Sequence, residues 1–303
     1  MSAADSSAAA RLTLPRLPDH QLAPLADAYA RANAAKRRST LLLLAVLIVA
    51  WFVAAGVAEV DLVKFASNID RFTNYIARLF YLESGVPVWR DPAEWFWGWK
   101  KWLSLLGDTL LIAYLGTLLG ATGAFFLCFL ASANLNTNAW TRGLVRRLLE
   151  FCRTVPELVF ALIFVVAFGL GPLPGVLALA IHSAGALGKL FAEVVENIDM
   201  KPVEGVTAAG ATWWQTVHLA AVPQVLSNFA SYGLLRFEIN VRGASVMGFV
   251  GAGGIGQDLI ESIRKFYYSD VSAVLLLIIV TVMIIDMATE RVRHYFIGQG
   301  TRP

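Results

Sequence analysis

The segment that organises the chain reads EGVTAAG from Glu204 to Gly210 and continues to Pro223. Long apolar stretches lie on both sides of it, so it connects two membrane spans, and it is itself too polar to cross a bilayer. Residues 207–217 contain good helix formers, and the helix breakers of the segment are Gly210 and Pro223. We therefore predict one or two short helices on the membrane face, where a soluble partner can hold them. An ordinary polar loop that ends at a proline is the alternative.

Composition places the chain among membrane proteins. Of its 303 residues, 57% are hydrophobic and 16% are charged, whereas soluble domains carry about 25% charged residues. The net charge of +3 gives no reason to expect a nucleic-acid partner. Cys128 and Cys152 are predicted to be free thiols, and the four histidines are scattered, so we expect neither a disulfide framework nor a metal site.

Six apolar segments are long enough to cross a bilayer. The basic cluster Lys36–Arg38 precedes the first of them, and the positive-inside rule then places both ends of the chain in the cytoplasm. We reject a cleaved signal peptide, because the region before the apolar run is too long and the run itself can span. The predicted spans cover residues 41–58, 104–131, 148–170, 175–198, 224–250 and 270–287.

Residues 61–103 are predicted to lie along the external membrane surface. Apolar residues recur at three- and four-residue steps from Phe65 to Leu79, which indicates an amphipathic helix. Five tryptophans follow between Trp89 and Trp102. Tryptophan prefers the membrane–water boundary, so this segment is expected to lie there.

Two glycine patterns point to close backbone packing. Gly116-x-x-x-Gly120 lets helices approach each other, and general packing within one subunit is an equally good interpretation. The run GAGGIG over 251–256 has the letters of a dinucleotide fingerprint, but apolar helices flank it instead of the required strand. We reject a nucleotide site and predict an outer turn that is part of a gate or substrate mouth, or simply a tight turn. Its glycines are Gly251, Gly253, Gly254 and Gly256.

Charged residues in the spans are expected to face a partner or a cavity, because each costs about 2.5–3.5 kcal/mol at the centre of a bilayer. Three pairs of opposite charges lie four residues apart on predicted helices, a spacing that allows pairing. They are Arg153–Glu157, Lys189–Glu193 and Glu238–Arg242. The spacing suggests no obvious partner for Glu196, Arg236 or Asp286.

Four runs of sequence together resemble the permease subunit of phosphonate ABC importers. They read RTVPEL from Arg153, GKLFAEVVEN from Gly188, RFEINVR from Arg236 and FVGAGGIG from Phe249. The resemblance covers about residues 100–297. The RFEINVR run is its more specific part, since methionine and osmolyte permeases have similar glycine runs.

The segment that begins at Glu204 is similar to the cytoplasmic coupling loop of ABC importer permeases. Two small residues follow an acidic one there, although this chain has Gly205 and Val206 where alanines are usual, and Ala220 replaces a larger aliphatic residue. The matching positions, which the resemblance assigns to ATPase coupling, are Glu204, Gly205, Val206, Gly210 and Pro223.

The resemblance implies an all-α membrane protein, a six-span bundle of the type I ABC importer kind with a cytoplasmic coupling helix. Two copies would form the channel, an ATP-binding subunit dimer would dock inside, and an external substrate-binding protein would deliver a phosphonate or phosphate-like anion. The setting would be the inner membrane of a bacterium. The alternatives are a methionine or osmolyte permease, and an ATP-independent facilitator or channel.

We predict no enzymatic activity and no bound cofactor for this chain, because it has no G-x-x-x-x-G-K-[ST] loop, no catalytic triad and no metal cluster. ATP and Mg²⁺ would belong to the partner ATPase. On this interpretation the chain divides into four parts. They are a cytoplasmic segment (1–40), a first span with an external segment (41–103), a permease core (104–297) containing the coupling loop 199–223, and a cytoplasmic tail (298–303).

The fifth predicted span carries the candidate substrate pathway. Arg236 and Arg242 lie deep in it, and we favour a pathway role over a structural ion pair. Because they are six residues apart, they point in different directions on a helix. Arg242 can pair with Glu238, so Arg236 is expected to face the transported anion. Asn240 completes the predicted pathway set.

Overall fold

The computed structural model describes residues 19–58 and 61–300, and these are almost entirely helical. The only β-structure within those ranges is one isolated bridge between Tyr81 and Pro87. The chain divides into two compact units, residues 1–72 and 73–303. The all-α fold class that the sequence predicts is therefore confirmed.

The first unit contains α1 (Asp19–Val57) and most of α2 (Leu62–Arg78). Residues Asp27–Val57 of α1 are long and apolar enough to cross a membrane. The helix α2 has apolar side chains on one face, which confirms the amphipathic helix predicted from the three- and four-residue steps.

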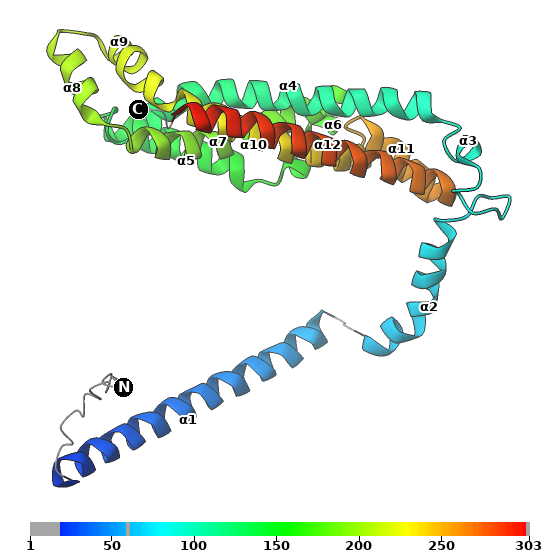
Figure 1. Ribbon diagram of the computed structural model, residues 1–303, viewed down its shortest axis with the longest axis horizontal. Coiled ribbons are helices and arrows are strands. Elements are labelled where there is room, and N and C mark those ends of the chain that lie inside the picture. The colour runs from blue at the N-terminus through cyan, green and yellow to red at the C-terminus, as the bar shows by residue number, and fades with distance from the viewer. Residues whose placement is uncertain (1–18, 59–60, 301–303) are drawn as a thin grey trace, which may run out of the picture. The chain divides into compact units, whose positions relative to one another are not determined.

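The second unit is a bundle in which α4, α7, α10 and α12 run side by side (Figure 1). In Figure 1, α8 and α9 lie at one end of this bundle, and α3 and α11 lie at the other. Its elements are α3 (Pro92–Trp95), α4 (Trp99–Ala131), α5 (Ala139–Thr154), α6 (Glu157–Phe168), α7 (Pro172–Glu196), α8 (Met200–Ala208), α9 (Trp213–Thr216), the π-helical turn η1 (Val217–Ala221), α10 (Val222–Met247), the 3₁₀ turn η2 (Gly248–Val250), α11 (Ile255–Lys265) and α12 (Tyr268–Gly300).

Glycines set the close approach of α4 to α7. A Cβ added at Gly116 would lie 2.6 Å from the Cβ of Leu179, and one at Gly120 would lie 2.6 Å from the Cβ of Ser183. Both distances are too short for real atoms, so only glycine allows this helix spacing. The interpretation of this pattern as packing within one subunit is confirmed.

Aromatic and aliphatic residues fill the bundle between these helices. Toward the α8–α9 end, Phe191 of α7 stacks on Phe229 of α10 with ring centroids 3.9 Å apart. Toward the other end, Trp102 is buried and its indole N–H donates to Asp258 of α11 at 2.8 Å. This tryptophan is a core residue, unlike the exposed Trp97, whose indole donates to Asp270.

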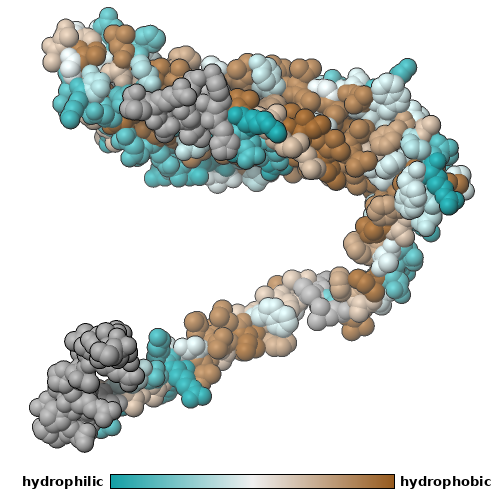
Figure 2. Space-filling view, viewed as in Figure 1, coloured by the Kyte–Doolittle hydropathy of each residue, from teal (hydrophilic) through white to brown (hydrophobic). Residues whose placement is uncertain are grey.

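Four described helices are long and apolar enough to cross a membrane, or five if the bent pair α5–α6 counts as one span. The bundle surface agrees with such a location, because Figure 2 shows hydrophobic side chains gathered over the middle of the second unit. Helix α10, predicted as a span, is not among the four or five, since Arg236, Glu238 and Arg242 make it too polar. The predicted count of six is thus not confirmed by length and composition.

The predicted third span, residues 148–170, is wrong as a single straight helix. Helix α5 ends at Thr154 and α6 begins at Glu157, with an angle of 86° between them. Pro156 causes the break, because proline lacks an N–H and disfavours helical backbone in the residue before it. The helices α5 and α11 also occupy parts of two stretches that lie between predicted spans, residues 132–147 and 251–269.

Candidate functional site

Two short helices form the connection between α7 and α10, as the sequence predicts. Asp199 caps α8 by accepting from the backbone N–H of Lys201 at 3.0 Å. The chain then turns at Gly210, whose φ of +86° favours glycine. Thr212 and Gln215 form a capping box that starts α9, and Pro223 lies in the first turn of α10.

The connection is anchored to the bundle on one side and open on the other. Val203 is buried, and the Trp213 indole donates to the carbonyl oxygen of Leu135 at 2.8 Å. The predicted coupling residues lie mostly on the exposed side, with Glu204, Gly205 and Gly210 exposed and Val206 half-buried. The loop around Leu135 thus meets the α8–α9 end, as expected if both loops lie on one side of a membrane.

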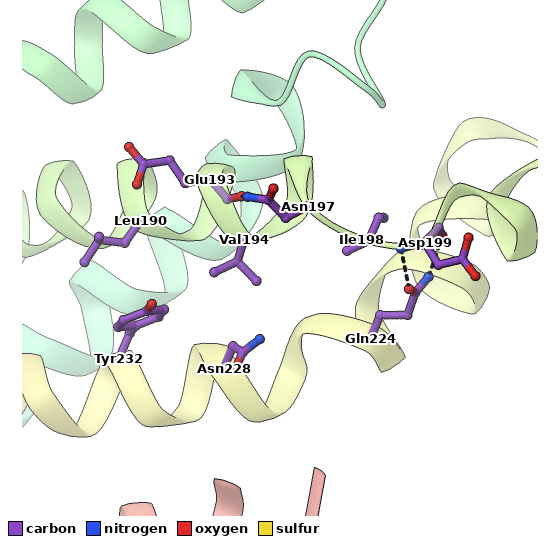
Figure 3. Close-up of a pocket in the computed structure, with 9 residues that line it drawn as sticks. All are labelled: Leu190, Glu193, Val194, Asn197, Ile198, Asp199, Gln224, Asn228 and Tyr232. Carbon is purple, nitrogen blue, oxygen red and sulfur yellow. Dashed lines mark hydrogen bonds between the residues drawn. The ribbon is translucent and has the colours of Figure 1, made fainter. Parts of the chain in front are cut away.

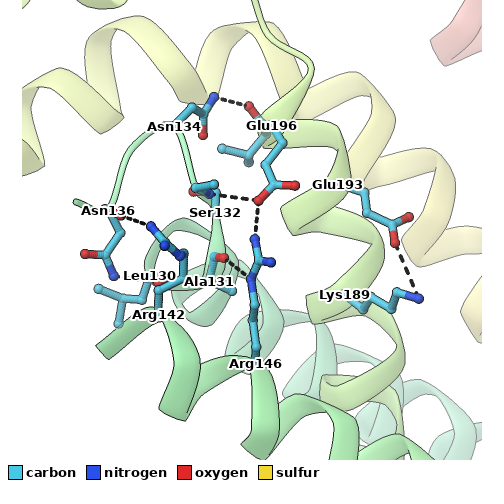
Figure 4. A network of polar contacts seen from close by, with 12 residues as sticks. Leu130, Ala131, Ser132, Asn134, Asn136, Arg142, Arg146, Lys189, Glu193 and Glu196 are labelled. Atoms are coloured by element: carbon cyan, nitrogen blue, oxygen red, sulfur yellow. Dashed lines mark hydrogen bonds and ion pairs between the residues drawn. The ribbon is translucent and has the colours of Figure 1, made fainter. Parts of the chain in front are cut away.

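A polar network joins the end of α4, the middle of α5 and the end of α7 (Figure 4). Glu196 forms an ion pair with Arg146 and accepts from the backbone N–H of Ala133 at 2.8 Å. The Nε of Arg146 also donates to the carbonyl oxygen of Ala131 at 2.7 Å. Glu196 therefore has a partner on another helix, which sequence spacing did not reveal.

The predicted pair Lys189–Glu193 forms on α7, with nitrogen and oxygen 3.5 Å apart. Glu193 also lines a cavity of about 420 Å³ between the end of α7 and the start of α10 (Figure 3). Its wall is polar near the connection, where Gln224 accepts from the backbone N–H of Asp199 at 3.0 Å. The other polar residues that line it are Asn197, Asn228 and Tyr232.

A second polar group is buried inside the bundle, on the face of α10 turned toward α4 and α7. The Nε of Arg236 donates to the hydroxyl of Ser183 at 3.1 Å. The amide of Asn240, one turn further along, donates to Ser183 and to Thr117, both at 2.8 Å. Asn240 is fully buried, and the side chain of Arg236 is only 11% exposed.

Glu157 supplies the opposite charge for Arg236. Its Oε2 lies 3.7 Å from Nη2 of Arg236, an ion pair without a hydrogen bond. The predicted pairing of Glu157 with Arg153 is wrong, because the break at Pro156 separates the two residues onto different helices. Within the described chain, Nη2 of Arg236 and Oδ1 of Asn240 are buried with no hydrogen-bond partner.

Arg242 lies apart from this group and contacts α12. It forms ion pairs with Glu238 and with Asp286, the latter at 3.4 Å. Glu238 also accepts from the hydroxyl of Thr289 at 3.5 Å. The prediction that Arg236 and Arg242 point in different directions is confirmed, and so is the Glu238–Arg242 pair.

The glycine run after α10 forms a tight buried turn. Gly251, Gly253 and Gly254 have φ values of +81°, +83° and +79°, which favour glycine. The carbonyl oxygen of Gly251 accepts from the backbone N–H of Gly171 at 3.0 Å, which joins this turn to the one between α6 and α7. Gly256 is also buried, at the start of α11. Protein covers the glycines of this turn, apart from the half-buried Gly251.

The fold and these polar groups define a multi-pass helical membrane protein with charges paired inside its bundle. Residues 128–297 match the family described as binding-protein-dependent transport system inner membrane component, and the chain belongs to it. A curated relative is the phosphite transport system permease protein PtxC of Stutzerimonas stutzeri. It is 43% identical over 201 residues, which cover 66% of this chain and 73% of that protein.

Two further relatives carry related names. The putative cryptic phosphonate transport system permease protein PhnE2 of Escherichia coli K12 is 49% identical over 121 residues, which are 40% of this chain and 99% of that protein. The phosphate-import permease protein PhnE of Mycolicibacterium smegmatis is 40% identical over 187 residues, which are 62% of this chain but 35% of that longer protein.

Solved structures agree on the fold. An inward-facing MetNI methionine ABC transporter chain matches with a TM-score of 0.57 and 19% identity, covering 68% of this chain and 98% of that one. A bacterial ABC transporter that imports alginate matches with a TM-score of 0.56 and 13% identity, covering 78% of this chain and 94% of that one. At these identities the likeness concerns the arrangement of helices alone.

Proposed function

We propose that this chain is the channel-forming transmembrane subunit of an ATP-driven importer for phosphonates or a related phosphorus oxyanion. The observation that carries the proposal is the buried guanidinium of Arg236, whose Nη2 lacks a hydrogen-bond partner among the described residues. It occurs in a chain whose curated relatives are named for phosphite, phosphonate and phosphate transport. A guanidinium suits these anions because its planar N–H groups match phosphoryl oxygens.

The substrate route follows α10 in this proposal. Arg236 faces the anion, and Asn240, which is fully buried on the same side of the helix, holds the Ser183 hydroxyl that Arg236 also contacts. Glu238 and Arg242 hold α10 against α12 at the border of the route. A second copy of the chain would present the same residues across the channel.

Helix α10 crosses the membrane in this proposal, and with α1 and the bent pair α5–α6 the chain has six spans. The charges of α10 are tolerated because partners on α6 and α12 neutralise them inside the protein. Both termini lie in the cytoplasm, together with the α8–α9 end. The glycine turn at residues 251–256 lies at the outer face and forms part of the gate.

The α8–α9 connection is the docking surface for a separate dimer of ATP-binding subunits, which hold the ATP and Mg²⁺. Its exposed side is suited to docking because the carboxylate of Glu204 can accept charge-assisted hydrogen bonds from a partner protein. The half-buried Val206 links that side to the bundle. An external substrate-binding protein delivers the anion at the opposite end.

Reconstitution in proteoliposomes tests this function. With the ATP-binding subunit inside and the binding protein outside, we expect ATP-dependent uptake of phosphite, phosphate or methylphosphonate. Uptake of the same anions without the ATP-binding subunit would show a facilitator instead. Uptake of methionine or carnitine, with none of the three anions, would show a permease of another substrate class.

A further inference from the structure

The position of Glu157 beside Arg236 is unusual for a structural ion pair. A buried pair that only stabilises a fold gains most from short, hydrogen-bonded contacts, because these offset the loss of hydration. Here the two charged groups are 3.7 Å apart and share no hydrogen bond. Arg236 gives its Nε hydrogen to Ser183 instead, and its buried Nη2 donates to no described residue.

The two groups also differ in how far they can move. The side chain of Arg236 is 11% exposed and fixed by Ser183, whereas that of Glu157 is 26% exposed. Glu157 stands in the first turn of α6, directly after the break at Pro156. The carboxylate is therefore the partner that can leave, and the guanidinium is the one that stays.

Gly243 provides the space in which the carboxylate lies. It follows Arg236 by seven residues, so the two lie on the same face of α10, about two turns apart. A Cβ at Gly243 would lie 2.7 Å from Oε1 of Glu157, which is too close. The atom that would be displaced is the end of a flexible side chain, so an alanine at this position would move the carboxylate and leave the helix in place.

We propose that Glu157 occupies the place beside Arg236 that the transported oxyanion takes, so that the carboxylate and the anion compete for the guanidinium. The inference rests on the proposed function and deepens it. A carboxylate and a phosphoryl group are both oxyanions that accept from a guanidinium. A resident competitor lowers the affinity of the route for its substrate, and a transport pathway needs binding weak enough for release.

Two measurements on Glu157→Gln test the competition. The first is the phosphite concentration that gives half-maximal thermal stabilisation of the purified permease–ATPase complex, without the external binding protein. We expect it to fall about tenfold, within the roughly 5- to 150-fold range common for coupled sites. The second is the maximal rate of ATP-driven uptake in proteoliposomes, which we expect to fall because release is slower.

Glu150→Gln is the matched control. Glu150 belongs to α5, in the same bent pair, and its ion pair with Arg147 is at the surface. The same loss of one carboxylate there should change neither the half-saturating concentration nor the uptake rate.

Gly243→Ala is the second variant, and it keeps both charges. It should lower the half-saturating phosphite concentration severalfold in the wild-type background, and should have no effect in a Glu157→Ala background. If Glu157→Gln yields no folded protein, Gly243→Ala alone tests the inference. An unchanged half-saturating phosphite concentration in that variant overturns it.

A folded Glu157→Gln variant with unchanged or weaker phosphite binding would also overturn it, because Glu157 would then only neutralise Arg236. In that case the proposed function stands if wild-type proteoliposomes still take up one of the three anions. An absence of uptake for all three anions would contradict both the proposed function and the inference about Glu157.

Discussion

The α8–α9 connection and the cluster around Arg236 are held together by different kinds of contact. The cluster comprises Arg236, Asn240, Ser183, Thr117 and Glu157. Most of the connection is exposed, and although Trp213 anchors it to Leu135, its caps join residues two or three positions apart, as Asp199 does with Lys201. The cluster is buried, and its hydrogen bonds cross the fold, with Arg236 and Ser183 separated by 53 residues and Asn240 and Thr117 by 123. A change in the connection should therefore stay local, whereas a change that displaces a helix around the cluster should affect several helices.

The largest effect that would sharpen this comparison is expected from Arg236→Ala. It removes the buried cation from the proposed route, and we expect uptake to fall on the order of 100-fold, because a hydrogen bond to a charged group contributes about 1.5–3 kcal/mol and each 1.4 kcal/mol is tenfold. Folded yield and basal ATPase activity should stay near wild type, because Glu157 is 26% exposed and can be hydrated. Normal uptake at normal yield would end the assignment of Arg236 to the route.

The same comparison explains what the sequence could predict. The two short helices around Gly210 were predictable, because breakers and capping residues act within a few positions. The Glu238–Arg242 and Lys189–Glu193 pairs were predictable for a similar reason, since four residues make one helical turn.

The partners of Arg236 and Glu196 were not predictable, since they belong to other helices and no sequence spacing brings them together. The predicted Arg153–Glu157 pair was wrong because it overlooked a local signal, the proline at position 156. Given that proline, a break and a reoriented Glu157 could have been expected. The ion pair between Glu157 and Arg236 could not have been expected, because the two residues belong to different helices.

The second prediction concerns a change in the helix packing around the Arg236 cluster that alters no charged residue. Gly120→Ala would place its Cβ 2.6 Å from the Cβ of Ser183 and 2.8 Å from the carbonyl oxygen of Ala180. Because α4 and α7 must separate, we expect a loss of about 1–3 kcal/mol, typical of overpacking. Detergent-extracted monodisperse protein should decrease, together with its thermal midpoint.

Gly123→Ala is the control for that change. It lies on the same helix three residues further along, and its added Cβ would have one neighbour at 3.7 Å, which is ordinary contact. Equal losses for the two variants would show that the α4–α7 spacing does not govern the result, because replacing glycine by alanine in itself favours a helix.

Arg242→Ala should act on stability more than on uptake. Among the described residues, it leaves Glu238, whose side chain is 16% exposed, with only the hydroxyl of Thr289. Arg242 itself is 49% exposed, so the cost lies between that of a surface pair and that of a buried pair, about 1–3 kcal/mol. Extracted yield should fall while uptake per folded molecule stays near wild type. A sharp loss of uptake at full yield would place Arg242 in the route beside Arg236.

The smallest effect on the fold is expected in the connection, where Gly210→Val and Gly205→Ala form a matched pair. Neither added Cβ would meet an atom within 4 Å, so space does not distinguish them. Backbone conformation does, because Gly210 has a φ of +86° and Gly205 lies inside α8.

Valine at position 210 should cost about 1–2 kcal/mol of local strain, and alanine at position 205 should strengthen α8 by up to about 1 kcal/mol. The bundle should keep its thermal midpoint in both variants, since the strain is confined to an exposed turn. Co-purification of the ATP-binding subunit should weaken for Gly210→Val and be retained for Gly205→Ala. Full docking and uptake by a folded Gly210→Val variant would show that this turn does not serve the ATPase, and that the connection is an ordinary link between helices.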